Sequence, residues 1–428
     1  MSPSVHALPL PPAAEEGPAL PPLRGVAAPR AVYVHVPFCR HRCAYCAFSV
    51  ARAPSPPVAA WLDAVRLELE LWFEGTGWTD RVELDTIYVG GGTPSLLGCA
   101  GMERLAVLLG ERFRWDPATV EWTAEANPTS LNEDVARKWR DVGVNRLSLG
   151  VQAFDDDVLA WLGREHDAAG ARRAVERGGA AGFENLNVDL LFGLPEALPR
   201  RWCREVLEAR DLGVGHLSLY GLSAEPRTPL GRRVELGRTL MPGDEPYARE
   251  YLAAVDVLSD AGYVHYEVSN FARPGLECRH NWCYWDGTAY LGLGPSAHTF
   301  LPPYRIWNVY RWDAYRRAVT SVAATEAVPI GTGGGAASLR EGWEEIRGHR
   351  ARLERLWLGL RTRRGLSRAD PAWRSAASGS ADRLARWMRA GWVREVEDRH
   401  GRRIRLTPTG WLRMDELVTR LAGERRER

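Results

Sequence analysis

Three cysteines, Cys39, Cys43 and Cys46, are the residues whose type and spacing most clearly imply chemistry. They form the pattern C-x3-C-x2-C and follow an apolar, strand-like run at residues 31–36. Three thiolates on one short loop can each bind one iron of a cubic 4Fe–4S cluster, which leaves the fourth iron without a protein ligand. Clusters that only transfer electrons are normally held by four cysteines, so this pattern indicates an iron that binds a further reactant.

Two other interpretations of these cysteines stay open at this point. They could bind zinc, with His35 or His41 as the fourth ligand, or they could be unrelated buried thiols. Zinc sites more often contain paired C-x2-C knuckles, and the sequence has no second knuckle. The spacing therefore favours an iron–sulfur cluster.

The composition is that of a globular protein of two or three domains, or of one large barrel with an appendage. The chain has 428 residues, of which 45% are hydrophobic and 26% charged, and its formal net charge is +2. This charge gives no general attraction to nucleic acid. No run of 18 apolar residues predicts a membrane span. Seven cysteines without a disulfide framework indicate a reducing compartment, so we expect a cytoplasmic protein.

Composition also predicts the domain boundaries. Residues 1–30 are rich in Pro and Ala and lack the pattern of a signal peptide, which predicts a disordered leader. Residues 31–330 form the main domain. Residues 331–342 begin with a glycine-rich run and are predicted to be a linker or insertion. Residues 343–428 form a separate C-terminal domain.

Strand and helix patterns alternate through the main domain, which predicts a parallel sheet with right-handed crossovers. Asn132 and Asp167 are the predicted N-caps of two of the helices. The strands are predicted at 31–36, 86–89, 121–125, 146–151, 185–191 and 216–220, and the helices at 58–73, 102–112, 133–142, 168–181 and 201–212.

The C-terminal domain has a different pattern. Helices are predicted at 343–360 and 381–389, followed by a hairpin of strands 392–396 and 403–406 and a final helix from Pro408. Helices followed by a hairpin resemble a winged helix, a fold that often binds DNA. The arginines here are spread along the helices of an arginine-rich chain, so the pattern argues against nucleic-acid binding.

Polar and glycine residues follow five consecutive predicted strands. The cysteines follow the first strand, a run from Gly90 to Gly92 the second, and Glu125, Gln152 and Asp189 the next three. Each residue taken alone has an ordinary structural explanation, such as a turn or a helix cap. In parallel α/β folds, however, ligands bind at the carboxyl ends of the strands, so the set predicts one shared pocket.

The chemistry of this pocket suits a cationic nucleoside. A glycine run exposes backbone groups that can hold an amino-acid moiety. The carboxylates suit ribose hydroxyls or a cation. Arg164, shortly after the fourth strand, suits a carboxylate through its planar fork.

At these residues the sequence resembles the radical S-adenosylmethionine (SAM) superfamily, and within it the oxygen-independent coproporphyrinogen III oxidase-like group. The resemblance rests on Tyr33-x-His-x-Pro-Phe-Cys39, the Gly-Thr-Pro run, Leu147-Ser-Leu-Gly-Val-Gln152 and Asp189-Leu-Leu-Phe-Gly-Leu-Pro195. It implies a partial (β/α)6 TIM-like barrel with a winged-helix-like C-terminal α+β domain, and a 4Fe–4S cluster on the three cysteines. The residues implied to line SAM are Tyr33, Gly91, Gly92, Thr93, Glu125, Gln152, Arg164 and Asp189.

Two details distinguish the branches of this group. The coproporphyrinogen dehydrogenases have a further cysteine two residues after the third cluster ligand, where this chain has Phe48, as heme chaperones do. The chaperones also carry the signature found here as His280-Asn-Trp-Cys-Tyr-Trp285. The resemblance implies heme bound at His280, an acceptor protein that receives it, and an electron donor for the cluster. Imidazole is a common axial ligand of heme iron, but His280 could instead join a loop to the barrel by hydrogen bonds. Oxygen-independent coproporphyrinogen III dehydrogenase stays the alternative function.

Overall fold

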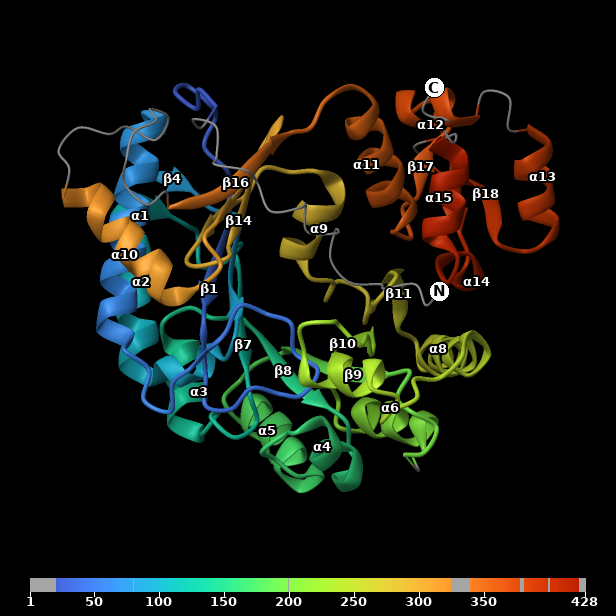
Figure 1. The fold of residues 1–428 in the computed structure, drawn as a ribbon, viewed down its shortest axis with the longest axis horizontal. Helices are drawn as coiled ribbons and strands as arrows, with labels where there is room; N and C mark the ends of the chain where they lie inside the picture. Colours follow the sequence, from blue (N-terminus) through green and yellow to red (C-terminus); the bar gives the residue numbers. More distant parts are fainter. Residues whose placement is uncertain are drawn as a thin grey trace.

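The computed structural model describes residues 21–79, 81–198, 200–324, 339–377, 381–398 and 401–422. Its centre is a nine-stranded sheet in the order β11-β12-β10-β9-β8-β7-β5-β1-β13. The sheet curves without closing and carries helices on its outer side (Figure 1). Seven of its strands are parallel to one another: β1 (Ala31–Val36), β5 (Thr86–Gly91), β7 (Glu121–Ala126), β8 (Arg146–Gln152), β9 (Asn185–Phe192), β10 (His216–Gly221) and β13 (Leu291–Leu293). This is the partial barrel that the sequence predicts.

All six predicted strands are present within two residues of their expected ends. The other three strands of this sheet were not predicted. β13 pairs with β1, and β11 (Val264–Glu267) and β12 (Asn270–Ala272) continue the opposite edge in antiparallel fashion. Short two-stranded sheets are formed by β2 (Phe38–Cys39) with β3 (Ala51–Arg52), and by β4 (Val82–Glu83) with β6 (Phe113–Arg114).

The helices follow the strands and cover the outer, apolar face of the sheet. The predicted caps are confirmed, because Asn132 accepts a hydrogen bond from the N–H of Val135 and Asp167 accepts one from that of Gly170. The helical segments are α1 (Val58–Thr76), η1 (Pro94–Leu97), α2 (Gly98–Arg112), α3 (Glu133–Asp141), α4 (Asp156–Leu162), α5 (Ala168–Ala180), α6 (Trp202–Asp211), α7 (Pro229–Glu235), α8 (Asp244–Asp260), α9 (Arg279–Asp286) and α10 (Trp312–Ala324).

The expected leader is partly ordered. Residues 1–20 lie outside the described residues, but residues 21–30 pack against the start of the barrel. Leu23 is buried, and Trp78 donates its indole N–H to the carbonyl of Val26 at 2.8 Å. Arg30 forms two hydrogen bonds of 2.7 Å with Asp85. The prediction of disorder is therefore wrong for residues 21–30, because the apolar side chain of Leu23 is buried in the main core.

The linker predicted at residues 331–342 does not extend to residue 342. Residues 331–338 lie outside the described residues. The chain from Arg340 to Glu345 is strand β16, which pairs with β15 (Tyr304–Asn308), which in turn pairs with β14 (His298–Leu301). The helix predicted from residue 343 therefore begins later, at α11 (Gly348–Leu360), after the backbone turns through Gly348 with φ of 57°.

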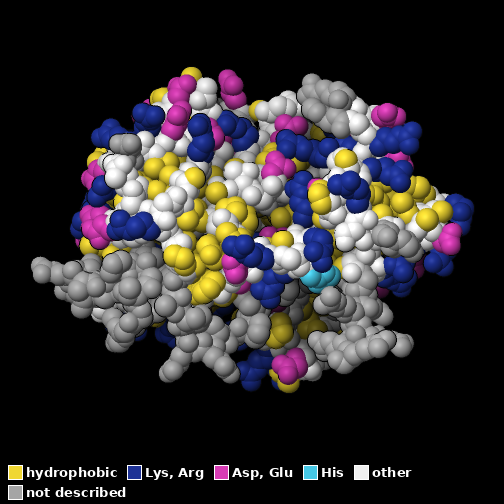
Figure 2. Space-filling model, turned by 90° about the horizontal axis from the view of Figure 1, so that it is seen from above, with side chains coloured by type: hydrophobic (Ala, Val, Ile, Leu, Met, Phe, Trp, Pro, Cys, Tyr) yellow, Lys and Arg dark blue, Asp and Glu magenta, His cyan; other side chains and the backbone are white. Residues whose placement is uncertain are grey.

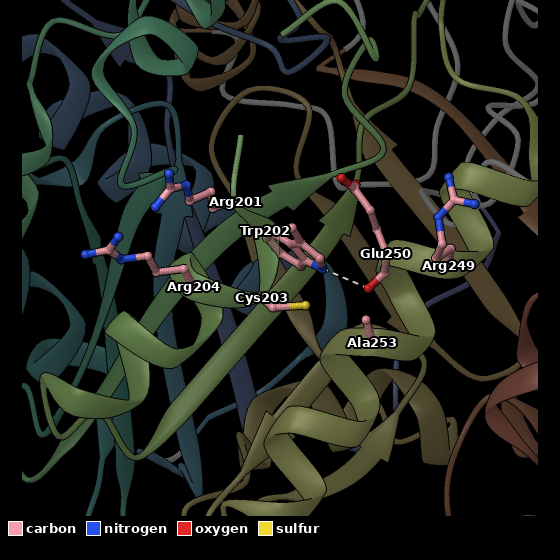
Figure 3. A pocket seen from close by; sticks show the side chains of 7 residues that line it. All are labelled: Arg201, Trp202, Cys203, Arg204, Arg249, Glu250 and Ala253. Carbon is pink, nitrogen blue, oxygen red and sulfur yellow. Dashed lines mark hydrogen bonds between the residues drawn. The ribbon is translucent and has the colours of Figure 1, made fainter. Parts of the chain in front are cut away.

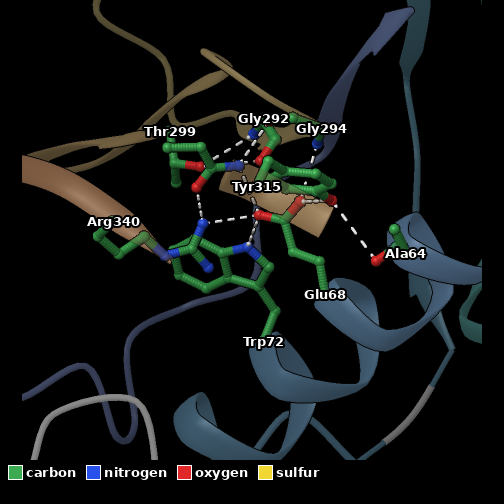
Figure 4. A network of polar contacts seen from close by, with 9 residues as sticks. Ala64, Glu68, Trp72, Gly292, Gly294, Thr299, Tyr315 and Arg340 are labelled. Carbon is green, nitrogen blue, oxygen red and sulfur yellow. Dashed lines mark hydrogen bonds and ion pairs between the residues drawn. The ribbon is translucent and has the colours of Figure 1, made fainter. Parts of the chain in front are cut away.

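A buried carboxylate on α1 joins this small sheet to the barrel (Figure 4). Glu68 has no exposed surface, and its oxygens accept hydrogen bonds from the side chains of Arg340, Asn308 and Tyr315 at 2.6, 2.8 and 2.7 Å. The backbone N–H of Gly294 donates to the same carboxylate at 2.8 Å. One side chain thus connects α1 to four segments that lie more than 200 residues later in the chain.

The C-terminal domain has its own apolar core and contains the predicted helices and hairpin. Its elements after α11 are β17 (Leu366–Ser367), α12 (Pro371–Ala377), α13 (Ala381–Arg389), β18 (Val393–Asp398), β19 (Gly401–Leu406), α14 (Pro408–Trp411) and α15 (Met414–Ala422), with the sheet order β17-β19-β18. A buried ion pair of 2.8 Å between Arg361 and Glu267 ties the domain to β11.

Two observations concern membranes and surface charge. No helix of the described residues is both long and apolar enough to cross a bilayer. On the face shown in Figure 2, Lys and Arg side chains alternate with Asp and Glu and with apolar side chains. A face of this kind does not attract an extended polyanion in the way that a continuous basic stripe does.

Candidate functional site

Alternation along the parallel strands gives the barrel an apolar outside and a polar inside. On β1, Val32, Val34 and Val36 are fully buried in the core, whereas Tyr33 between them is partly exposed. Parallel strands covered on both faces are usually apolar throughout, so this alternation indicates a polar cavity. The polar, partly exposed side chains on the inner face include Tyr33, Tyr88, Glu125, Gln152, Asp189 and Tyr220.

The three cysteines lie on the loop that follows β1, at the carboxyl end of the parallel strands. All three thiols are free and partly exposed. The Cys39 thiol lies 3.3 Å from the hydroxyl of Thr93, and Arg164 donates to the Cys43 sulfur at 3.3 Å. Burial raises the pKa of Cys39 to about 11, and the neighbouring Cys46 and Cys43 sulfurs add to this rise. The three sulfurs are therefore close enough to interact.

The histidines considered as zinc ligands do not complete this site. His35 is buried, its Nδ1 is 3.0 Å from the hydroxyl of Tyr33, and its Nε2 is 2.9 Å from the carbonyl of Ser49. Burial lowers the pKa of His35 to about 4. Within the described ranges, no three His, Cys, Asp or Glu side chains converge as ligands of a single metal ion. A cubic cluster needs no such convergence, since each thiolate binds a different iron.

The glycine run at the end of β5 packs so closely against β1 and the start of the cysteine loop that no side chain fits there. Gly91 has φ of 113°, which side chains rarely adopt, and a Cβ there would lie 2.6 Å from the His35 ring. At Gly92, a Cβ would lie 2.7 Å from the carbonyl oxygen of Phe38 and 3.1 Å from the Cys39 sulfur. The run is therefore a contact surface for the loop and more than a plain turn.

Two carboxylates on the inner face of the sheet, Glu125 and Asp189, are close enough to interact. Glu125 accepts hydrogen bonds from the Tyr88 hydroxyl at 2.8 Å and from the N–H of Gly91 at 3.0 Å. Burial raises the pKa of Glu125 to about 7, and the nearby charge of Asp189 adds to the rise. Burial also raises the pKa of Asp189, opposed by a hydrogen bond of 2.8 Å from Asn187. Neither carboxylate has a cationic partner as close as a salt bridge among the described residues, which suits a pocket that binds a cation.

Gln152 and Arg164 lie together at the carboxyl end of β8. Gln152 has φ of 74°, a strained value for a residue with a side chain, and the register of β8 against β9 shifts beside it. Such strain is often found at functional sites. Arg164 donates to the Gly150 carbonyl at 2.6 Å, while its Nε is buried and has no partner in the described part of the chain. An unpaired guanidinium N–H beside the cysteines suits a carboxylate ligand.

The residues present therefore fit a 4Fe–4S cluster with a cationic amino-acid nucleoside beside it. The structure brings the eight predicted SAM-lining residues and the three cysteines to one end of the barrel. It offers free thiols, a glycine contact too tight for a side chain, unpaired carboxylates and an unsatisfied arginine donor. Tyr45, between Cys43 and Cys46, was not predicted to take part. Its pKa is raised by burial, and Arg164 opposes this rise, which places its ring beside the site. Its position inside the cysteine motif is the sequence feature that could have predicted this location.

His280 lies at the opposite end of the barrel from the cysteines. Its ring is fully buried, with Nδ1 2.8 Å from the hydroxyl of Thr86, the first residue of β5, and Nε2 3.0 Å from that of Tyr284. Its backbone N–H donates to Glu121, the first residue of β7, at 2.9 Å. Both ring nitrogens are hydrogen-bonded in this conformation. The geometry therefore matches the alternative in which His280 joins a loop to the barrel by hydrogen bonds. Burial, together with the charge of Arg146, lowers the pKa of His280 to about 3.

The signature around His280 connects three parts of the molecule. The Tyr88 ring, which reaches Glu125 through its hydroxyl, lies 5.2 Å from the His280 ring. At the other end of α9, the guanidinium of Arg361 from the C-terminal domain lies 4.2 Å from the Trp285 ring. The signature therefore covers the end of the barrel where the parallel strands begin, here called the floor of the barrel, and it also contacts the C-terminal domain.

A separate depression lies on the outside of the barrel, between α6 and α8 (Figure 3). Trp202 donates its indole N–H to the carbonyl oxygen of Glu250 at 2.7 Å and fills the space between the two helices. The other lining residues are Arg201, Cys203, Arg204, Arg249 and Ala253. None of these seven residues belongs to the predicted site, so this depression is distinct from it.

Comparisons with known proteins agree with the geometry. The model of the radical SAM superfamily matches residues 33–202. The heme chaperone HemW of Mycobacterium tuberculosis is 36% identical over 411 residues, which cover 95% of this chain and 98% of that protein. HemW of Escherichia coli is 35% identical over 272 residues, 63% of this chain and 70% of that protein.

A solved structure shows the same fold. The coproporphyrinogen III oxidase HemN of Escherichia coli, described as a radical SAM enzyme, has a TM-score of 0.72 and 23% identity, covering 92% of this chain and 90% of that one. At this identity the likeness establishes the fold alone. The HemW of Mycobacterium tuberculosis, by contrast, is 36% identical and is matched over 98% of its length. This chain therefore belongs to the HemW family of the radical SAM superfamily.

Proposed function

We propose that this protein binds heme and delivers it to an acceptor protein, and that it carries a 4Fe–4S cluster on Cys39, Cys43 and Cys46 with SAM beside it. The observation that carries the proposal is similarity to a heme chaperone over 98% of that protein's length. Phe48 supports the same branch, because it stands where the coproporphyrinogen dehydrogenases have a further cysteine.

The residues at the strand ends have separate tasks in this proposal. Arg164 pairs with the carboxylate of SAM through its free Nε, and the N–H and carbonyl groups of the glycine run hold its amino-acid part. Glu125 and Asp189 bind the ribose hydroxyls and balance the sulfonium charge. When bound, a reduced cluster supplies one electron to SAM. The protein positions the nucleoside and keeps water out through Tyr33 and Tyr88.

Heme ligation by His280 requires a change in the barrel floor. The ring is buried and hydrogen-bonded to Thr86 and Tyr284, so iron can reach it only if α9 moves away from β5. Such a movement would also disturb the contact between Trp285 and Arg361. We therefore infer that heme binding at His280 is accompanied by loosening of the C-terminal domain.

Anaerobic reconstitution followed by heme titration, with and without SAM, tests this proposal. We expect a Soret shift, loss of the 4Fe–4S absorbance in Cys43→Ala, and loss of the Soret shift in His280→Ala. Faster proteolysis of the C-terminal domain in the presence of heme would accompany opening of α9. A Soret shift unchanged in His280→Ala would place heme elsewhere. Conversion of coproporphyrinogen III at enzymatic rates would instead establish the dehydrogenase function.

A further inference from the structure

The segment that carries the cysteines is unusually basic. Residues 17 to 62 include five arginines and no aspartate or glutamate, although the chain has 54 acidic residues among 428. Arg40, Arg42 and Arg52 lie in or directly after the cysteine loop, and their side chains are exposed. Arg42 reaches across the loop and donates to the carbonyl of Cys46 at 3.3 Å. Three of these five arginines therefore place positive charge beside the thiols, whereas Arg24 and Arg30 precede β1 and Arg30 is paired with Asp85.

The same loop exposes two aromatic rings. Phe48 is 66% exposed and Tyr310 is 38% exposed, and they are the aromatic members of the exposed large apolar side chains in the described residues. The Tyr310 hydroxyl donates to the carbonyl of Ala47 at 3.0 Å, and the Ser49 hydroxyl donates to the carbonyl of Tyr310. Both neighbours of Phe48 thus contact Tyr310, so the two rings belong to one surface.

A fourth arginine borders these rings from another part of the chain. Arg227 is exposed at the turn before α7, and Leu230 of α7 donates to the carbonyl of Ala44 in the cysteine loop at 2.8 Å. Burial raises the pKa of Tyr310, Arg42 and Arg227 oppose that rise, and Glu341 adds to it. The surroundings of Tyr310 therefore combine two guanidinium groups with one carboxylate.

We propose that this arginine–aromatic surface, made of Arg40, Arg42, Phe48, Arg52, Arg227 and Tyr310, is the docking site of a small acidic electron-carrier protein. The proposal rests on the proposed function, since only a protein with a redox cluster needs such a partner. An exposed aromatic centre with a charged rim is typical of transient protein interfaces, and the sign of the rim selects a partner of negative charge.

The position of the surface argues for an electron carrier over other acidic proteins. It covers the loop that holds all three thiols, and these thiols are themselves partly exposed. A partner seated on Phe48 and Tyr310 would come within a few residues of Cys46, whereas the floor of the barrel at His280 lies at the far end of the strands. Heme exchange at His280 and electron delivery at the loop can then take place on different faces.

The experiment measures binding of a purified, fluorescently labelled flavodoxin to the full-length chain, first without and then with the reconstituted cluster. We expect the double variant Arg40→Glu/Arg227→Glu to weaken binding about tenfold, because each replacement of an attraction by a repulsion changes the binding free energy by about 0.7 kcal/mol in total. Phe48→Ser should weaken it as well, and added salt should weaken binding of the unchanged protein.

The matched control lies on α2, where Val107 is 64% exposed and Arg104 is exposed one turn away. The variants Val107→Ser and Arg104→Glu should change the affinity for flavodoxin less than twofold. Equal affinity of the double variant and the unchanged protein would overturn the proposal. So would tight binding to phosphatidylglycerol-containing vesicles through the same arginines without binding to flavodoxin, since this would make the surface a membrane contact.

A second readout separates this proposal from the proposed function. In the reconstituted protein, the double variant should be reduced by dithionite at the normal rate but by reduced flavodoxin at about one tenth of the normal rate at subsaturating concentration. Its heme titration should be unchanged. Failure to bind heme or a cluster would refute the proposed function, while the binding measurement on the cluster-free chain would still test the docking surface.

Discussion

Replacement of Glu68 by Ala should destabilise the protein by about 3–5 kcal/mol, the typical cost of removing one partner from a buried ion pair. The carboxylate is fully buried, and its loss removes the anionic acceptor of the Arg340 guanidinium and one of the two acceptors of the Asn308 amide, which keeps the Gly294 carbonyl. The N–H of Gly294 loses its acceptor as well, and the hydroxyl of Tyr315 keeps only the Ala64 carbonyl at 3.5 Å.

The assay is guanidinium denaturation followed by tryptophan fluorescence. With a slope of about 4 kcal/mol per molar, a loss of 4 kcal/mol lowers the midpoint by about 1 M. Glu70→Ala is the matched control on the same helix, because Glu70 forms an exposed i,i+4 pair with Arg66 at 2.8 Å. Exposed pairs of this kind contribute about 0.5 kcal/mol or less, so the midpoint should scarcely move.

The double variant Glu68→Ala/Arg340→Met tests the physical reason. Removing Arg340 in the Glu68→Ala background should cost much less than removing it from the unchanged protein, because the uncompensated buried charge disappears. The variant Glu68→Ala should also retain less cluster, since the network supports the segment that contacts the cysteine loop. Equal midpoints for Glu68→Ala and Glu70→Ala, or fully additive effects in the double variant, would refute this reasoning.

Three further predictions concern the site and its supports. Gly92→Ala should lower the cluster content without unfolding the barrel, because the new Cβ would lie 2.7 Å from the Phe38 carbonyl oxygen. Iron and sulfide analysis measures the cluster content, and Gly110→Ala is the control, because a Cβ at Gly110 in α2 has space. SAM affinity should fall as the pH drops below about 7, because the Glu125 carboxylate, whose pKa is raised to about 7, then takes up a proton and no longer attracts a cation. Calorimetry at pH 6 and pH 8 measures this affinity, and equal affinities at the two pH values would contradict the prediction. Asn132→Ala should cost about 1 kcal/mol through loss of the cap of α3, visible as a lower denaturation midpoint.

The sequence predicted the parallel strands well because each is a short apolar segment separated from the next by a helix pattern. β13 escaped prediction because three residues, Leu291–Leu293, show no periodicity, and their role depends on pairing with β1, about 260 residues away. Burial of Leu23 could not be predicted either, since scattered leucines among prolines and alanines resemble a flexible leader.

The site was predictable where position along a strand determines it. Glu125, Gln152 and Asp189 were expected in one pocket because the carboxyl ends of parallel strands meet at one edge. The surroundings of His280 were not predictable, because its hydrogen-bond partner Thr86 lies 194 residues earlier. Glu68 was missed for a similar reason, since an acidic residue in an amphipathic helix normally faces water.

The support of the cysteine loop by the segment around Tyr310 has a consequence for biosynthesis. The Ser49 hydroxyl donates to the Tyr310 carbonyl, and Glu68 is neutralised by Arg340. Tyr310, which helps to hold the cysteine loop in place, lies more than 250 residues later in the chain, so it is translated long after the three cysteines. Iron and sulfide delivered to the nascent chain would meet an unsupported loop. Cluster insertion should therefore follow completion of the barrel. The cysteine loop of the folded chain must then still be accessible to a cluster donor.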